Sequence, residues 1–118
     1  MNDHAEPSIE RATSPAAGVV VLEFAGELDL AVHARFAALV DEVVAESPRV
    51  VVADLTGSEF MDSTMLRELL RAHSALDEIG ATFVVAGSQP SVRRLLELTG
   101  TDEMLTLADS RDAALAGR

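Results

Sequence analysis

The sequence predicts an α/β fold: a mixed sheet of about five strands with about four helices, with a parallel centre and an N-terminal antiparallel hairpin. Three observations lead to this fold class. Two short apolar segments open the chain with a turn between them. After them, segments with the spacing of amphipathic helices alternate with β-branched apolar runs. The 118 residues are enough for one compact domain with its own core.

The first elements form the predicted hairpin. Residues 8–13 are expected to be a short edge strand, and the valine-rich residues 19–24 its partner, because Pro and Gly punctuate the segment between them. The polar residues 1–7 are predicted to be a flexible tail. The domain is therefore expected to span residues 8–116.

A helix is predicted from Leu30 to the stop signal Ser47-Pro48. His33 lies on the flank of its apolar stripe and is expected to be solvated. Residues 49–55 follow as an almost uninterrupted apolar run, which predicts a strand buried on both faces.

A second helix is predicted to begin near Asp62 or Ser63, and Gly80 is well placed to end it. Apolar residues recur along it at helical spacing, so one side of this helix is expected to face the core. The residues on this stripe are Leu66, Leu69, Leu70, His73 and Leu76.

The remaining chain repeats the alternation. Residues 81–86 are predicted to be a buried strand, and a helix with Pro90 in its first turn ends at Gly100. Residues 104–107 are predicted to be a last strand, and Ser110 the cap of a terminal helix. The residues expected to be nearly fully buried are Val51, Val52, Leu55, Leu69, Leu70, Val84 and Val85.

The composition argues against several classes of partner. Nine basic against twenty acidic residues give a formal net charge of −11. This charge argues against nucleic acid and against anionic membrane as partners, since both are bound through Lys and Arg. The chain has no cysteine, and no apolar run approaches the ~20 residues of a membrane span. A cytoplasmic protein is expected.

The sequence lacks the constellations of common enzymes. Asp54 ends a predicted strand, as phosphate-accepting aspartates do, but Thr56 stands where a second Asp is needed and the chain has no Lys. Asp54 is expected instead to organise its loop by accepting N–H bonds. His4, His33 and His73 show no metal-ligand spacing, and no Gly-x-Ser-x-Gly motif occurs. We predict no catalytic activity, no metal and no cofactor.

The triplet Asp62-Ser63-Thr64 has two interpretations. All three residue types are preferred helix N-caps, so the triplet can simply begin the second helix. Alternatively, a hydroxyl at that helix N-terminus is an acceptor for phosphate, whose charge the helix dipole would tolerate and a docked partner would not.

Three motifs carry a family resemblance. Gly26-Glu27-Leu28-Asp29 follows a predicted strand, residues 51–57 run into Phe60-Met61-Asp62-Ser63-Thr64, and residues 92–100 cover a predicted helix. In this order they resemble the STAS domain, which anti-sigma factor antagonists share with the cytoplasmic tails of sulphate transporters. The resemblance covers residues 8–116.

The resemblance implies a partner switch rather than an enzyme. In that family, an anti-sigma factor that is also a serine kinase phosphorylates the serine of the Asp-Ser pair. The unphosphorylated antagonist binds the kinase and frees the sigma factor, phosphorylation blocks this binding, and a phosphatase restores it. Ser63 would be the phosphorylated residue. The partner-binding residues would be Gly26, Glu27, Asp29, Asp62, Thr64 and Met65.

Met65 departs from the family pattern, which usually has Gly two residues after the serine. We expect Met65 to place a flexible apolar side chain where Gly would let a partner's backbone approach. It would then fit a different partner or close the site to the kinase. The alternative function is a STAS scaffold subunit of a signalling assembly or of a lipid-transport ATPase complex, without phosphorylation.

Overall fold

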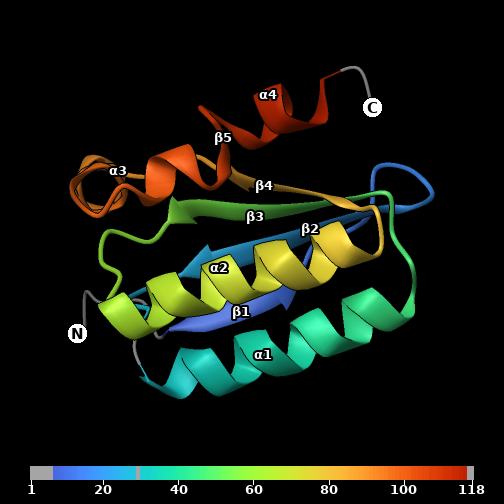
Figure 1. Ribbon diagram of the computed structural model, residues 1–118, viewed down its shortest axis with the longest axis horizontal. Coiled ribbons are helices and arrows are strands. Elements are labelled where there is room, and N and C mark those ends of the chain that lie inside the picture. Colours follow the sequence, from blue (N-terminus) through green and yellow to red (C-terminus); the bar gives the residue numbers. More distant parts are fainter. Residues whose placement is uncertain (1–6, 29, 117–118) are drawn as a thin grey trace.

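A five-stranded sheet in the order β1-β2-β3-β4-β5 forms the centre of the computed structural model, which describes residues 7–28 and 30–116 (Figure 1). The sheet pairs β1 with β2 antiparallel, and β2, β3, β4 and β5 parallel to one another. The predicted hairpin and parallel centre are confirmed. The strands are β1 (Ser8–Arg11), β2 (Val19–Ala25), β3 (Val50–Gly57), β4 (Thr82–Ala86) and β5 (Thr106–Ala108).

Helices connect the parallel strands and cover the sheet unequally. α1 and α2 lie side by side on one face, and the short α4 lies on the other (Figure 1). Right-handed crossovers between neighbouring parallel strands place successive helices on the same face, which explains the pairing of α1 with α2. The helices are α1 (Leu30–Ala45), α2 (Ser63–Glu78), α3 (Pro90–Leu98) and α4 (Arg111–Leu115).

The chain between α3 and β5 differs from the prediction. Gly100 adopts a left-handed conformation (φ 75°) and begins a short 3-10 helix, η1 (Thr101–Glu103). Met104 closes that turn and is largely exposed, so the strand begins at Thr106 rather than at residue 104. The order of apolar and polar residues around residue 104 does not distinguish such a turn from the start of a strand.

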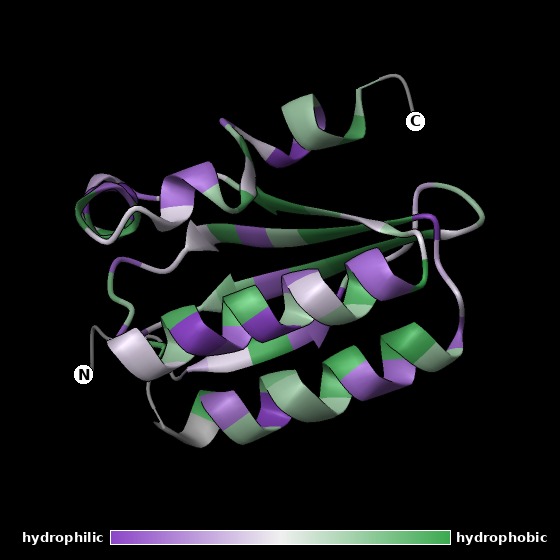
Figure 2. Ribbon diagram, in the orientation of Figure 1, coloured by the Kyte–Doolittle hydropathy of each residue, from purple (hydrophilic) through white to green (hydrophobic). Residues whose placement is uncertain are grey.

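β3 is the centre of both cores. Val51, Ala53 and Leu55 belong to the core shared with α1, α2 and α3, whereas Val50 and Val52 belong to a smaller core on the α4 face. The prediction of a strand buried on both faces is confirmed. The hydropathy colouring shows the same contrast, because the central strands are largely hydrophobic while α1 and α2 alternate between hydrophobic and hydrophilic residues (Figure 2).

One predicted core residue is wrong. Six of the seven are buried, but Leu70 is only partly buried. The inward stripe of α2 runs through Leu69, Ala72 and Leu76, and one residue further along the helix turns the side chain by about 100°. Leu70 therefore lies on the flank of α2, where it lines a groove beside α1.

Leu69→Ala and Leu70→Ala form a matched pair that tests this assignment. Leu69→Ala should lower the free energy of unfolding by about 2–5 kcal/mol, because it removes buried methyl groups and leaves a cavity. Leu70→Ala should cost clearly less, because its side chain already contacts solvent. Urea denaturation of both variants measures the difference, and equal losses would contradict the assigned face.

Candidate functional site

The carboxyl ends of β2, β3 and β4 meet at one edge of the sheet because these strands are parallel. In such sheets this edge is where ligands and partners bind. The turn after β2 is joined here to the β3–α2 loop: the Gly26 N–H donates to the Gly57 carbonyl (3.0 Å), and the Leu28 N–H donates to the Phe60 carbonyl (3.1 Å). Two of the sequence motifs therefore form one continuous surface, with Glu27 exposed on it.

Asp62 is the N-cap of α2. Its Oδ1 accepts a hydrogen bond from the Met65 N–H at 2.8 Å. Ser63 and Thr64 follow as exposed residues of the first turn. Because Asp62 performs the capping, the Ser63 hydroxyl is not used for it and makes no hydrogen bond with the described residues. The capping interpretation of the triplet is confirmed for Asp62 and leaves Ser63 accessible. Asp29, also expected at this edge, lies outside the described residues.

His33 was expected to be solvated, and this expectation is wrong. The residue is only 8% exposed, and its Nε2 lies 3.1 Å from Oδ1 of Asp62. Burial tends to raise the pKa of Asp62, but the hydrogen bonds from Met65 and His33 outweigh it and hold that pKa below its ordinary value. His33 thus links α1 to the start of α2. Helical spacing could not reveal this, because the contact joins two separate helices.

A double-mutant cycle tests whether the contact between His33 and Asp62 stabilises the protein. His33→Ala removes buried atoms and Asp62→Ala removes a cap, so each should destabilise the protein by itself. If the two side chains interact, the double variant should lose about 0.5–1.5 kcal/mol less than the sum of the single losses. Urea denaturation at neutral pH measures all four proteins. Additive losses would mean that His33 only fills space.

Met65 does not occupy the surface expected of it. The residue is fully buried (0% exposed) and belongs to the core beneath α2 with Leu66 and Leu69. The third residue of this helix points inward. Its side chain therefore fills part of the core and does not lie on the surface at the carboxyl ends of the strands. The expected contact between a partner and the Met65 side chain is therefore corrected. What Met65 offers near the edge is its N–H, which Asp62 already accepts.

Asp54 accepts local hydrogen bonds as predicted, but it does so within β3, which runs to Gly57, and not in a loop after the strand. Its Oδ1 accepts the Thr56 N–H at 3.0 Å and the Thr56 hydroxyl at 2.6 Å. Its Oδ2 accepts from Nε of Arg111 at 2.9 Å, and the same guanidinium pairs with Glu23. Burial tends to raise the pKa of Asp54, but the Thr56 bonds and the Arg111 charge together hold it below its ordinary value. Asp54 thereby ties α4 to the end of β3.

The start of α3 is bonded to the end of β3 and to the beginning of the β3–α2 loop. The Gln89 side-chain amide donates to the Thr56 carbonyl at 2.6 Å, and the Ser91 hydroxyl donates to the Glu59 carbonyl. Gln89 is the N-cap position of α3, but its side chain makes no capping bond. The two side chains at the start of α3 hold the loop instead. This was not foreseen, because residue type alone does not separate capping from a bond to a distant loop.

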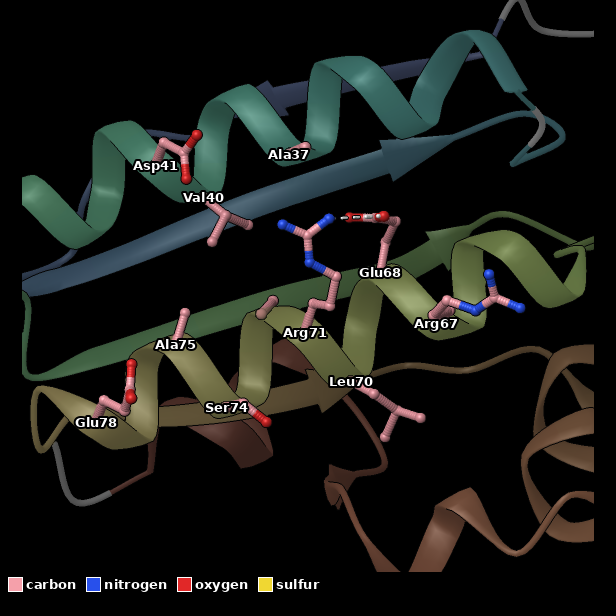
Figure 3. A pocket seen from close by; sticks show the side chains of 11 residues that line it. Ala37, Val40, Asp41, Arg67, Glu68, Leu70, Arg71, Ser74, Ala75 and Glu78 are labelled. Carbon is pink, nitrogen blue, oxygen red and sulfur yellow. Dashed lines mark hydrogen bonds and ion pairs between the residues drawn. The ribbon is translucent and has the colours of Figure 1, made fainter.

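A groove of about 470 Å³ runs between α1 and α2, where Arg71 pairs with Glu68 at 3.3 Å (Figure 3). Within residues 7–28 and 30–116, no group of three or more His, Asp or Glu residues is arranged to hold a metal ion. In the same part of the chain, no helix has the length and apolar character needed to span a membrane.

Comparison with known proteins establishes the family. Residues 10–114 match the model of the STAS domain, so the chain belongs to the STAS domain family and the resemblance seen in the sequence is confirmed. The chain is 33% identical over 100 residues to the anti-sigma-F factor antagonist RsfB of Mycobacterium tuberculosis. The aligned residues make up 85% of this chain and 81% of RsfB.

Two further similar proteins are also named as anti-sigma factor antagonists. An anti-sigma F factor antagonist of Paenibacillus polymyxa is 27% identical over 99 residues, covering 83% of this chain and 85% of that protein. The crystal structure of an anti-sigma factor antagonist from Mycobacterium paratuberculosis superimposes with a TM-score of 0.79 at 32% identity, with 92% of each chain covered. The fold predicted for this chain is thus the fold of that family.

Proposed function

We propose that the protein is an anti-sigma factor antagonist that binds a serine-kinase anti-sigma factor while Ser63 is unmodified. The supporting observation is the exposed hydroxyl of Ser63 at the first position of α2, beside a cap that Asp62 supplies. The family membership and the names of the relatives support the same function. In this proposal the protein acts in the cytoplasm as a binding switch and not as an enzyme.

Phosphorylation of Ser63 would switch binding off through charge. A phosphate there would lie at the positive end of the α2 dipole, so the fold tolerates it. A partner docked on the same edge would instead meet a new charge of about −1.5 to −2 that it must desolvate or repel. The proposed docking surface comprises Gly26, Glu27, Asp62 and Thr64, with Asp29 beside them, and a phosphatase would restore binding.

The scaffold alternative receives no support from Met65. It was suggested because a side chain at that position was expected to obstruct the kinase, and Met65 is buried in the core. Replacing it with Gly would remove core volume and weaken the first turn of α2, so Met65→Gly is not a useful test of kinase access. Ser63 and Thr64 are the exposed residues of that turn, and Met65 does not cover them.

The test begins with the chain as bait in an extract of its native host, to obtain the anti-sigma factor for purification. Incubation of wild type with the purified kinase and ATP should place one phosphate on Ser63, located by mass spectrometry. Ser63→Ala should bind the kinase and stay unmodified, whereas Ser74→Ala, a change at an exposed serine further along α2, should be phosphorylated normally. Phosphate on Thr64, or none on the wild type, would contradict the proposal.

Ser63→Asp tests the effect of charge. A carboxylate at the start of α2 is favourable by about 0.3–1 kcal/mol, so the variant should fold as well as the wild type. Its affinity for the anti-sigma factor should nevertheless fall, by less than phosphate causes because aspartate carries less charge. Ser74→Asp, an exposed serine further along the same helix, is the matched control and should bind normally. Equal affinity of both variants would leave the charge switch without support.

A further inference from the structure

Two large apolar side chains stand exposed beside the loop that carries Ser63. Phe60 is 50% exposed and Leu98 is 72% exposed. With Met61 and Leu95 they line a hollow of about 280 Å³ between the β3–α2 loop and α3, which we call the loop–α3 hollow. Single exposed apolar side chains are common on protein surfaces. A contiguous group of them is typical of an interaction surface.

The loop–α3 hollow is held in shape before any partner arrives. The Ser91 hydroxyl donates to the Glu59 carbonyl, and Gln89 donates to the Thr56 carbonyl, so the end of β3 and the beginning of the loop are fastened to the start of α3. A preformed surface needs little ordering on binding, and more of the contact energy then appears as affinity.

The rim of the hollow carries one charge of each sign. Arg94 lines it from α3 and Glu59 from the loop, and neither side chain forms an ion pair with the described residues. In the α1–α2 groove, by contrast, Arg71 already pairs with Glu68 (Figure 3). The loop–α3 hollow therefore offers an apolar floor and two charges that have no ion-pair partner in the described part of the chain.

We infer that the loop–α3 hollow is an anchor pocket for the anti-sigma factor. It receives one apolar side chain of that partner, with an acidic group directed at Arg94 and a basic group at Glu59. This inference rests on the proposed function. Phe60 lies three residues before Ser63, so one partner can fill the hollow and reach the hydroxyl together. The anchor is separate from the modified residue, and it holds the chain while the kinase acts.

The experiment measures binding of the purified anti-sigma factor to the full chain by titration calorimetry. Phe60→Ala and Leu98→Ala should each weaken binding about tenfold or more, as expected for central apolar contacts. Ile79→Ala is the matched control, since Ile79 is 42% exposed at the far end of α2 and should change affinity less than about twofold. Phe60→Leu, which keeps an apolar side chain, should retain most of the affinity.

Charge and kinetics give independent readouts. Arg94→Gln should weaken binding and reduce its salt dependence, whereas Arg35→Gln, an exposed arginine on α1, should do neither. In the kinase assay, Phe60→Ala should raise the KM for the chain and leave kcat nearly unchanged, because the lost contact only holds the substrate.

The outcomes separate the two proposals. If wild type binds and is phosphorylated but Phe60→Ala and Leu98→Ala bind like Ile79→Ala, the anchor pocket is wrong and the proposed function stands. Equal losses for Phe60→Ala and Phe60→Leu would also contradict seating of an apolar group. If wild type binds no serine-kinase anti-sigma factor, both proposals fail.

Discussion

Parallel pairing of β2, β3 and β4 is the constraint on which the proposed site depends. It forces the three strands to end at the same edge, and so it brings together loops that lie far apart in the sequence. The strand at the centre, β3, is buried on both faces and belongs to both cores. Because its position is fixed from both sides, the loop that follows it begins at a fixed place.

Two aspartates join the helices to the sheet and to one another. Asp54, near the end of β3, binds Thr56 of the same strand and, through Arg111, joins the strand to α4. Asp62 joins α1 to α2 by accepting from His33 and from the Met65 N–H with one oxygen atom. In each case hydrogen bonds to the ionised carboxylate outweigh the cost of partial burial. The acidic chain thus uses two of its carboxylates to position the surface that presents Ser63.

The sequence was sufficient for the fold but not for every part of the site. The pattern of apolar residues located the main helices and strands, because a helix buried on one face, a strand buried on one face and a strand buried on both faces differ in that pattern. The exposed Ser63 was also predictable, since helix starts follow from local residue types. Met65 was misplaced although it precedes Leu69 and Leu76 at helical spacing, so its inward direction was present in the sequence. His33 was misplaced because its partner Asp62 lies at the start of another helix, and a local pattern does not reveal such a contact. The hollow beside Phe60 likewise needs α3 and the loop together.

The central claim is that partners dock on the edge where the parallel strands end. Chemical-shift mapping of the isotope-labelled protein with the purified anti-sigma factor tests it most directly. The account predicts that the amide signals that change belong to the turn after β2, to the β3–α2 loop with the first turn of α2, and to α3. Changes concentrated at the opposite edge, around Ser47 and Gly80, or on α4, would contradict it.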